Sequence, residues 1–554
     1  MSSKPPLRIV PLGGLGEFGL NCMVIERGDD AFAVDCGIMF PDAHLMGIDL
    51  VIPDVTYLRE LGDRFKGFVL THGHEDHLGA LPWIWGEFDV PVWATPFTAG
   101  LLRERMNDHP ELAKKTIEIY NDGSRFNVGC FEIEAVPVTH SIVDACSLVI
   151  RSCGETMIHT GDFKIDPTPI DGRNFGADRF REIGDEGVKL LLSDSTNIET
   201  EGSSGSERLV RGYMEPMFKA TRGRVFVTTF ASHIHRLVAV FSLARETGRK
   251  VAILGRRMES NAALASHTGH LAIPLDLIVD SKEAMRMPPG KVCYLLTGSQ
   301  GEARSALTRL AFLEMQGVVP GPGDAVIYSS KVIPGNDRPI GAVIDQLYRL
   351  GCEVYYPRRA KAHVSGHACK DELRTMLELV RPEYFVPVHG EFRNLVHHAK
   401  LAAETGVDET KIVRLMDGDV LEIDHLGAHR RGTVPVGRVL VDGDIVGVED
   451  KGVVRDRRNI SSDGMVLVVL AVAQQSGMIL SGPDFVMRGV ATEGGPDPDE
   501  EPLRRAVEAA IAAMPKAAVR DLDELSEEVR VAARRWFRRN LGSRPLVVPY
   551  VMEL

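Results

Sequence analysis

Residues 71–80 read Thr-His-Gly-His-Glu-Asp-His-Leu-Gly-Ala and hold the densest group of possible metal ligands in the chain. The ligand-type side chains are His72, His74, Asp76 and His77. Imidazole and carboxylate are ligands that zinc and related divalent metals prefer. The apolar run 68–70 predicts a buried strand, and Gly73 lets the backbone turn after it. A polar loop with hydrogen-bonded histidines is the alternative, but four such side chains at one strand end favour a metal site that performs chemistry.

Further histidine and aspartate side chains follow predicted strands in the same way. They are His140, Asp162, Asp194 and His389. Each alone is typical of a turn or cap residue, and Asp194, which precedes Ser195-Thr196-Asn197, would suit a helix N-cap. The repeated format, an apolar run followed by a possible ligand, favours one shared site.

The elements that must position these residues follow two patterns. Short apolar runs between Gly- and Asp-rich turns fill the first 200 residues and predict stacked sheets. These runs are residues 7–12, 22–25, 31–34, 68–70, 91–94, 133–138 and 147–150. From about residue 206, strands alternate with helices, as in a doubly wound α/β domain. The predicted strands are 224–229, 250–254, 292–297, 325–329 and 354–356, with helices over 233–246 and 261–267.

After residue 360 the short elements return, and the chain ends in a different pattern. Residues 432–462 are rich in Gly, Asp and Arg turns and predict a connector. Strands over 466–472, 478–487 and 545–551, with two amphipathic helices before the last, predict a small α/β domain. The acidic loop 493–501 is expected to be mobile.

The bulk composition limits the class of protein. A chain of 554 residues, 44% hydrophobic and 25% charged, predicts a globular protein of two to four domains. The net charge of -13 weakly opposes nucleic-acid binding, although a local basic groove is compatible with it. Eight cysteines without a Cys-x-x-Cys motif predict buried free thiols of a reducing compartment. With no signal-peptide core and no long apolar run, we expect a soluble cytoplasmic protein.

The order of these motifs resembles a known family. His-x-His-x-Asp-His, then a lone histidine, then Gly161-Asp162, resembles the metallo-β-lactamase superfamily of hydrolases, and Asp35 resembles its first motif, a support for the metal loop. The insert, with Asp194 before it and His367 and His389 after it, resembles the nucleic-acid-processing β-CASP branch. Within that branch the chain closely resembles bacterial ribonuclease J. The specific shared stretches are 13–17, 47–49, 297–302, 329–336 and 363–367.

This resemblance covers essentially the whole chain, least sharply after residue 460, and implies the fold. We expect a metallo-β-lactamase αββα sandwich with an inserted β-CASP doubly wound α/β domain and a small C-terminal α/β domain. The expected boundaries are 1–205 for the first part of the sandwich, 206–359 for the β-CASP domain, 360–431 for the second part of the sandwich, 432–462 for the connector and 463–554 for the C-terminal domain.

The resemblance also implies two divalent metal ions, zinc or manganese. Their ligands would be His72, His74 and His140 for one ion and Asp76, His77 and His389 for the other, with Asp162 bridging. Seven nitrogen and oxygen ligands exceed one tetrahedral site but suit two ions with open positions. Asp194 and His367 resemble the acid–base pair of the family.

The implied substrate is single-stranded RNA, with its 5′ phosphate in a pocket. The pocket residues would be Ser232, His233, His363, Val364, Ser365, Gly366 and His367. The first two open a predicted helix, whose N-terminus favours an anion, and the small residues among the others let a backbone approach closely. A basic track could lead to the pocket, with an ordinary solvated face as the alternative. Its residues would be Arg256, Arg257, Lys331, Arg358, Arg359 and Lys361.

Two further expectations concern sites away from the chemistry. Gly47, Asp49 and Asp442 could form an oxygen-rich site for Ca²⁺ or Mg²⁺, with ordinary surface acids as the alternative. By the resemblance, the C-terminal domain would support a homodimer or homotetramer, and other RNA-decay proteins are possible partners.

The predicted activity is 5′-to-3′ exonucleolytic hydrolysis of RNA that prefers a 5′ monophosphate, with endonucleolytic cleavage as well, in RNA processing and decay. A hydrolase of a small substrate is one alternative, but it would not need the large insert. A DNA-directed β-CASP nuclease is another, although such enzymes tend to carry valine where this chain has His389. The complete ligand set argues against an inactive RNA-binding scaffold.

Overall fold

A computed structural model describes residues 4–42, 44–333, 335–448, 450–473, 478–491 and 500–554. The chain divides into two compact units, one formed by residues 1–39 and 52–438 and the other by residues 40–51 and 439–554. Most of the predicted loop 493–501 lies outside the described residues.

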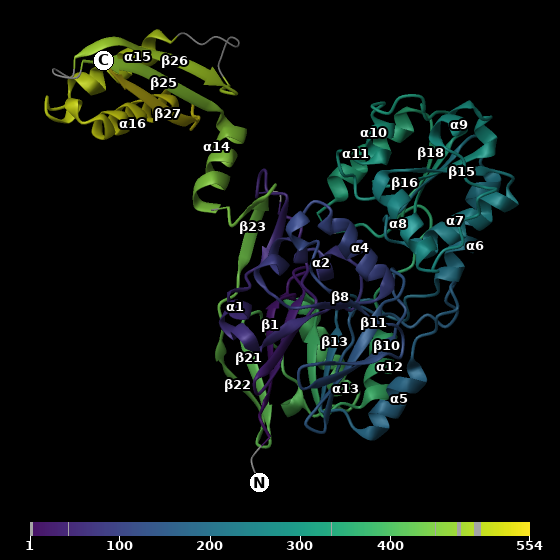
Figure 1. Cartoon of the computed structure of the whole chain (residues 1–554). Coiled ribbons are helices and arrows are strands. Elements are labelled where there is room, and N and C mark those ends of the chain that lie inside the picture. The colour runs from purple at the N-terminus through teal and green to yellow at the C-terminus, as the bar shows by residue number, and fades with distance from the viewer. Residues whose placement is uncertain (1–3, 43, 334, 449, 474–477, 492–499) are drawn as a thin grey trace. The chain divides into compact units, whose positions relative to one another are not determined.

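The first unit contains two stacked sheets (Figure 1). Within the described residues, the eight-stranded sheet has the order β22 (Gly427–Thr433), β21 (Asp419–Asp424), β1 (Leu7–Gly13), β3 (Cys22–Arg27), β4 (Asp30–Val34), β6 (Phe65–Val69), β7 (Val92–Ala94) and β8 (Ile117–Ile119). The second sheet has the order β19 (Tyr384–Val388), β13 (Leu190–Asp194), β12 (Glu155–His159), β11 (Cys146–Ser152), β10 (Phe131–Pro137) and β9 (Arg125–Val128). Alternate apolar side chains such as Ile9, Phe32, Leu148 and Leu192 form the buried core between the sheets.

Helices cover the outer sides of this sandwich. The helices on the second sheet are α5 (Ala177–Glu186), α12 (Lys370–Val380) and α13 (Phe392–Glu404). Val149 and Leu191, which point away from the inter-sheet core, pack in one cluster with Phe180 and Met376 of these helices. After β5 (Leu50–Pro53), the connections between strands of the first sheet contain α1 (Thr56–Leu61), α2 (Glu75–Leu78), α3 (Leu81–Ile84) and α4 (Pro96–Met106). The αββα sandwich predicted from the sequence is confirmed.

The inserted domain has its own parallel sheet. The strand order is β15 (Lys250–Leu254), β16 (Val292–Leu296), β14 (Val225–Thr228), β17 (Ala325–Tyr328) and β18 (Glu353–Tyr355). One face is covered by α6 (Glu207–Ala220), α7 (Ile234–Glu246) and α8 (Arg256–His267), and the other by α9 (Ser281–Arg286), α10 (Ala306–Ala311) and α11 (Asp337–Arg349) (Figure 1). Val225 faces the first group and Phe226 the second, so the strands are buried on both faces. The doubly wound insert is therefore confirmed.

The second unit is built on a three-stranded sheet. Its order is β26 (Ile479–Arg488), β25 (Met465–Val472) and β27 (Leu546–Glu553), and α15 (Glu501–Ala512) and α16 (Leu522–Asn540) cover one face. The connector region holds more regular structure than its turn-rich sequence suggested, namely the hairpin of β23 (Arg438–Asp442) and β24 (Ile445–Val446) and the helix α14 (Arg455–Asp463). The helix has no buried side chain, so it carries no apolar periodicity that could reveal it.

Two other sequence-based expectations can be compared with the structure. No helix in the described part of the chain is both long enough and apolar enough to span a bilayer. Six of the eight free cysteines are buried, but Cys130 and Cys153 are exposed. This corrects the expectation that all are buried, because both lie in turns between neighbouring strands of the second sheet.

Candidate active site

The structure brings all seven predicted metal ligands together at the carboxyl ends of strands. The ligands at positions 72–77 follow β6, His140 follows β10, Asp162 follows β12 and His389 follows β19. Neighbouring strands place these ends close together, which is why residues distant in sequence meet. One ligand group contains His72, His74, His140 and Asp162, and a second contains Asp76, His77, Asp162 and His389.

The ring nitrogens of the first group face one another. His74 Nδ1 lies 3.1 Å from His72 Nε2 and 3.1 Å from His140 Nε2. A zinc ion with tetrahedral bonds of about 2.0–2.1 Å would place its ligand atoms about 3.3 Å apart, so this spacing fits a metal. Burial lowers the pKa of His74 to about 4 and those of His72 and His140 well below the usual value. The three imidazoles are therefore neutral, which is the form that binds metals.

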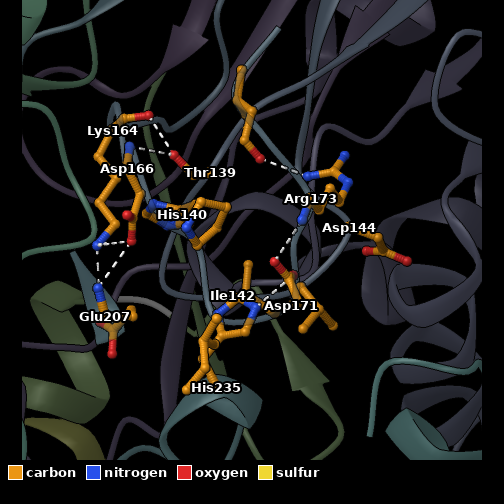
Figure 2. Close-up of a pocket in the computed structure, with 14 residues that line it drawn as sticks. Thr139, His140, Ile142, Asp144, Lys164, Asp166, Asp171, Arg173, Glu207 and His235 are labelled. Carbon is orange, nitrogen blue, oxygen red and sulfur yellow. Dashed lines mark hydrogen bonds and ion pairs between the residues drawn. The ribbon is translucent and has the colours of Figure 1, made fainter. Parts of the chain in front are cut away.

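Behind His140 lies a small cavity lined mostly by polar and charged side chains (Figure 2). Lys164 and Asp166 are among them, and both are buried. The other ring nitrogen of His140, Nδ1, donates a hydrogen bond to the Gly366 carbonyl at 2.7 Å. This bond fixes the ring with Nε2 toward the ligand group.

The second ligand group is rich in negative charge. His77 Nε2 lies 3.2 Å from Asp162 Oδ2 and 3.6 Å from Asp76 Oδ2, and His389 Nε2 lies 3.5 Å from the same Asp76 oxygen. Burial opposes protonation of both imidazoles, but the neighbouring carboxylates, Asp162 foremost, raise the pKa of each well above its usual value. The negative charge of these carboxylates favours positive charge in the site, and a divalent cation would supply it in place of protons on the histidines.

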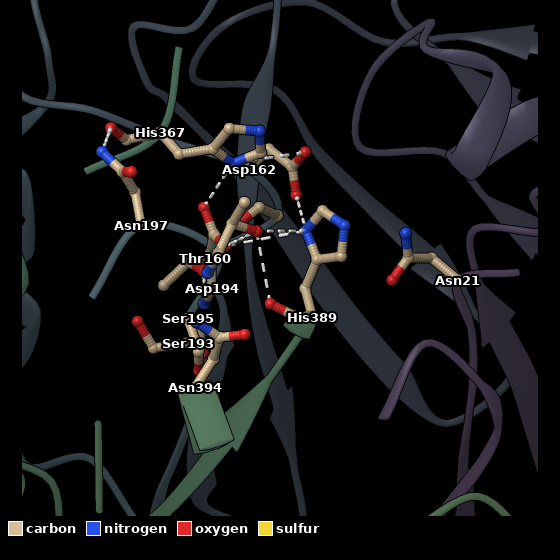
Figure 3. A network of polar contacts seen from close by, with 12 residues as sticks. Asn21, Thr160, Asp162, Ser193, Asp194, Ser195, Asn197, His367, His389 and Asn394 are labelled. Atoms are coloured by element: carbon tan, nitrogen blue, oxygen red, sulfur yellow. Dashed lines mark hydrogen bonds and ion pairs between the residues drawn. The ribbon is translucent and has the colours of Figure 1, made fainter. Parts of the chain in front are cut away.

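Asp162 belongs to both groups, and Figure 3 shows it beside His389. Its Oδ2 is 3.6 Å from His72 Nε2 and 3.2 Å from His77 Nε2. Its Oδ1 is buried and makes no hydrogen bond within the described residues, although His389 Nδ1 lies 2.8 Å away. A buried carboxylate oxygen in this state fits a metal ligand, and membership of both groups suits a bridge.

Asp35 supports residues 71–80, which we call the metal loop. It adopts a positive φ of 62°, and its two carboxylate oxygens accept hydrogen bonds from the Thr71 amide and hydroxyl, each at 2.8 Å. His77 Nδ1 also lies 2.8 Å from Asp35 Oδ2, which directs His77 Nε2 to the ligand group. Asn21, which the sequence reading did not single out, donates to the Asp76 carbonyl at 3.0 Å. A lone asparagine after a glycine-rich turn has no spacing pattern that would reveal this role.

Asp194 and His367 form a hydrogen-bonded pair beside the ligands (Figure 3). His367 Nδ1 lies 2.9 Å from Asp194 Oδ2, and Asp194 Oδ1 accepts from the Thr196 amide at 2.9 Å and hydroxyl at 2.7 Å. One carboxylate oxygen of Asp194 thus binds the turn that follows it, and the other oxygen binds His367. Burial opposes ionisation, but His367 keeps the pKa of the Asp194 carboxyl below its usual range. The side chains of Asp194 and His367 also lie close to Asp162 and His389, so distance alone permits Asp194 and His367 to be metal ligands.

Residues 363–367 run directly past the metal ligands. The Gly366 carbonyl contacts His140, and a Cβ at position 366 would lie 2.6 Å from the Ser141 hydroxyl oxygen, so only glycine fits without displacement. Ser365 Oγ accepts from the His367 amide at 3.2 Å, and Val364 is buried. The segment therefore connects the predicted phosphate pocket to the ligand groups.

The two predicted halves of the phosphate pocket also meet. Ser232 is half-buried just before α7, and His233 is buried at its N-terminus. The Arg236 guanidinium nitrogen Nη2 lies 3.1 Å from His233 Nε2 and 3.5 Å from His363 Nδ1. Sequence reading missed Arg236, because a single arginine inside an amphipathic helix gives no signal of its own.

The predicted basic track is only partly gathered near the site. Lys331 Nζ lies 3.4 Å from Asn197 Oδ1, close to the Asp194 turn, and Arg257 Nη1 lies 4.0 Å from Glu75 Oε1 of the metal loop. Arg359 instead pairs with Glu353 of the adjacent strand β18.

The proposed second cation site is arranged around an arginine. Arg457 donates to the Gly47 carbonyl at 2.9 Å and forms an ion pair with Asp442, while Asp49 accepts from the Gly443 amide at 2.8 Å. Because the guanidinium already neutralises Asp442, these contacts do not support a metal ion there.

Four family models match the chain. They are the metallo-β-lactamase superfamily at residues 15–183, the ribonuclease J β-CASP domain at 222–347, the Zn-dependent metallo-hydrolase RNA specificity domain at 355–413 and the ribonuclease J C-terminal domain at 452–554. A crystal structure of a protein of unknown function from Enterococcus faecalis V583 is similar with a TM-score of 0.52 and 15% identity, covering 79% of this chain and 100% of that one. That likeness shows the fold alone.

Known relatives match over nearly the full length. Ribonuclease J of Sinorhizobium meliloti is 37% identical over 100% of this chain and 98% of its own length. Ribonuclease J of Helicobacter pylori strain ATCC 700392 / 26695 is 35% identical over 98% and 78%, and ribonuclease J2 of Bacillus subtilis is 34% identical over 99% of both chains. The chain therefore belongs to the ribonuclease J family of metal-dependent ribonucleases.

Proposed function

We propose that this ribonuclease degrades RNA in the 5′-to-3′ direction from a 5′ monophosphate and also cleaves RNA internally. The observation that carries the proposal is the course of residues 363–367. His363 contacts Arg236 at the predicted phosphate pocket, which we call the chain-end pocket. Further along the segment, Gly366 contacts the ligand His140, and His367 contacts Asp194. A phosphate held at one end of this segment would thus place a neighbouring phosphodiester near the ligand groups at the other end.

We infer two ions, zinc or manganese, held by the seven ligands. The nitrogen-rich first group suits zinc, and the carboxylates of the second also suit manganese. When bound, two such ions supply positive charge that stabilises both the attacking and the leaving oxygen of an in-line phosphoryl displacement.

The Asp194–His367 pair would handle protons. Asp194 is ionised and accepts from His367 Nδ1, so the imidazole is oriented with Nε2 free to face the substrate. His367 remains partly accessible to solvent, with 23% of its side chain exposed, whereas Asp194 is buried. We assign His367 the proton transfer at the leaving oxygen and Asp194 the orientation of that imidazole.

The chain-end pocket would select the phosphate by size. Residues 363–367 lie against the first ligand group, which limits the depth available for a chain end. A monophosphate would suit a pocket of limited depth, whereas a triphosphate adds charge and bulk. Internal cleavage does not need the pocket and is expected to be insensitive to the 5′ end.

Substitution Ser365→Leu tests this division of roles. A bulky side chain there should suppress stepwise degradation of a linear 5′-monophosphate RNA about tenfold or more, but reduce cleavage of a circular RNA much less. The exposed Ser462→Leu serves as a matched control and should change neither rate. Equal losses on the linear and circular RNAs would contradict chain-end recognition by this pocket.

A second measurement tests the end preference and the metal together. Parent enzyme is stripped with a chelator, reloaded with zinc or manganese, and given 5′-monophosphate or 5′-triphosphate RNA of the same sequence. We expect activity to return with the preferred metal and the monophosphate RNA to be degraded faster. Full activity after complete metal removal would contradict the two-ion proposal.

We also infer a homodimer or homotetramer formed through the second unit, acting in cytoplasmic RNA processing and decay. The free cysteines suit a reducing compartment. Within the described residues, α15 and α16 pack on one face of the sheet of the second unit, and large apolar side chains such as Val548 and Tyr550 are exposed on the other face.

A further inference from the structure

A buried guanidinium lies beneath the two halves of the chain-end pocket. Arg236 of α7 has no solvent exposure. It donates to the Ser329 carbonyl at 2.6 Å, to the Ala362 carbonyl at 3.1 Å and to both oxygens of Glu207 at 3.1 and 3.3 Å. These contacts join α6, α7, the end of β17 and the segment that returns to the sandwich, so the guanidinium is held in one position.

This fixed guanidinium constrains the protons of two histidines. Arginine nitrogens can only donate hydrogen bonds, and Arg236 Nη2 lies 3.1 Å from His233 Nε2 and 3.5 Å from His363 Nδ1. The two Nη2 hydrogens are shared among the Glu207 carboxylate and these two ring nitrogens, and we assign both ring nitrogens as acceptors. In a neutral imidazole the proton then lies on the opposite nitrogen, which is Nδ1 of His233 and Nε2 of His363.

The other ring nitrogen of His233 is Nδ1. His233 Nδ1 is buried and makes no hydrogen bond within the described residues. An unpaired buried N–H is costly, so a ligand that accepts this hydrogen bond would be stabilised. The neighbouring Ser232 is half-buried at the same helix start, where an anion is favoured.

Burial, with a contribution from the Arg236 charge, favours the neutral form of both histidines. Burial foremost lowers the pKa of His233 to about 4 and that of His363 well below its usual value, and the Arg236 charge adds to both shifts. Glu207 Oε1 also lies 3.3 Å from His233 Nε2 and can accept from it, so a His233 proton on Nε2 is the competing tautomer that nitrogen-15 NMR distinguishes. Lys164 Nζ, 4.0 Å from Glu207 Oε1, completes a buried charge cluster that adjoins the cavity behind His140 (Figure 2).

We propose that Arg236 is a positioning residue for the chain end: it fixes the tautomers of His233 and His363 so that each presents one N–H donor to the 5′ phosphate. The inference rests on the proposed role of this pocket in binding that phosphate. Arg236 itself does not touch the RNA, because it is fully buried and its donors are directed to protein acceptors.

The test removes the guanidinium without leaving a buried charge unpaired. The double variant Arg236→Gln/Glu207→Gln is compared with the parent, because removal of Arg236 alone would leave the Glu207 carboxylate uncompensated. Binding is measured by fluorescence anisotropy with a 2′-O-methyl RNA that carries either a 5′ phosphate or a 5′ hydroxyl. The ratio of the two Kd values reports the contribution of the end phosphate.

We expect the Kd ratio to fall about tenfold or more in the double variant, as for loss of one or two hydrogen bonds to a charged group. Cleavage of circular RNA should stay within about threefold of the parent. Arg249→Gln is the matched control, because Arg249 is also buried in the insert but donates to the carbonyls of Gly223 and Val292 instead. That control should keep the parent ratio.

A spectroscopic readout separates positioning from general stability. Nitrogen-15 NMR of histidine-labelled enzyme should show a proton on Nδ1 of His233 and on Nε2 of His363, assigned by loss of each signal in single His→Gln variants. The double variant should lose this fixed pattern. If it fails to fold, Arg236→Lys, which keeps the charge but not the planar fork, is measured in the same way and should also lower the ratio.

The outcomes distinguish the two proposals. A parent enzyme that binds the phosphate and hydroxyl RNAs equally would overturn the pocket assignment itself. A parent that prefers the phosphate, with a folded double variant that keeps the full ratio, would overturn the role of Arg236 alone. Equal losses on circular RNA and in the Kd ratio would also overturn it, since Arg236 would then only support the fold.

Discussion

Protonation separates the two ligand groups at the scale of single residues. His72, His74 and His140 are held neutral by burial, whereas the carboxylates of the second group draw protons onto His77 and His389. Without a cation the second group therefore takes up protons, and a divalent ion bound there would replace that positive charge.

Substitution His77→Ala is expected to abolish detectable RNA cleavage, a loss of at least about 10²–10³-fold, because it removes both a ligand and the partner of Asp35. Cleavage of 5′-labelled RNA and the metal content of the purified protein are the measurements. His425→Ala changes an exposed histidine in a turn and should leave both unchanged. Near-normal cleavage by a folded His77→Ala enzyme would rule out the two-ion assignment.

Substitution Asp194→Asn distinguishes a proton-handling role from a ligand role. Both Asp194 oxygens are already hydrogen-bonded, one to Thr196 and the other to His367. We therefore expect the cleavage rate to fall about 10²–10⁴-fold while the metal content stays near that of the parent. An enzyme emptied of metal by this change would show instead that Asp194 is a ligand.

The types of the site residues could be predicted from the sequence, but their orientations could not. His72, His74, Asp76 and His77 were recognisable because their spacing is dense and follows an apolar run. The contacts of Asn21 or Arg236 were not, because they depend on backbone segments that only the fold brings together.

At the scale of elements, the metal loop depends on a close backbone approach. Gly37 follows β4 and packs against α2, so that a Cβ there would lie 1.7 Å from the Asp76 carbonyl oxygen. The backbone on either side of Gly37 is fixed, because the amides of Cys36 and Ile38 donate to the His77 and Glu75 carbonyls. The position of two ligands on α2 is therefore set by the absence of a side chain at Gly37.

Substitution Gly37→Ala should displace α2, because backbone atoms rather than a flexible side chain occupy the space. We expect a loss of about 1–3 kcal/mol in stability and a larger proportional loss of RNA cleavage, measured by thermal unfolding and by single-turnover rates. Gly341→Ala in α11, which meets no atom within 4 Å, should stabilise by about 0.5–1 kcal/mol and keep the rate. Parent-like activity of Gly37→Ala would contradict this account of the metal loop.

Elements with an apolar face were predictable, and elements without one were not. The strands of the insert matched closely, because parallel strands buried on both faces read as continuous apolar runs. Helix α14 and the β23–β24 hairpin were missed because their stabilising contacts, such as the pair between Arg457 and Asp442, are polar and lie far apart in sequence. The expected domain boundaries stay predictions.

At the scale of the whole molecule, the candidate active site and the proposed surface for self-association fall in different units. Every candidate ligand of the two-ion site and every residue of the predicted phosphate pocket lies in the first unit. In the second, Val466 and Val468 of β25 pack under the helices, while Val486, Val548 and Tyr550 are exposed on the other side of the sheet. The register pairs Leu467 with both Val486 and Val548, so these apolar side chains form one continuous face. An apolar face of this kind suits an interface between copies of the chain.

Substitution Tyr550→Glu places a charge on that face, on the edge strand β27, where the tyrosine is 57% exposed and its loss should not disturb the core. We expect the mass measured by light scattering to fall below that of the parent dimer or tetramer, because burying an unpaired carboxylate in an apolar interface is costly. Cleavage of circular RNA should persist, since the catalytic residues belong to the first unit. Leu426→Glu, at an exposed leucine in the turn between β21 and β22, is the control and should leave the mass unchanged. If the Tyr550→Glu enzyme keeps the parent mass, assembly uses another surface; if the parent is itself a monomer, the inferred dimer is wrong.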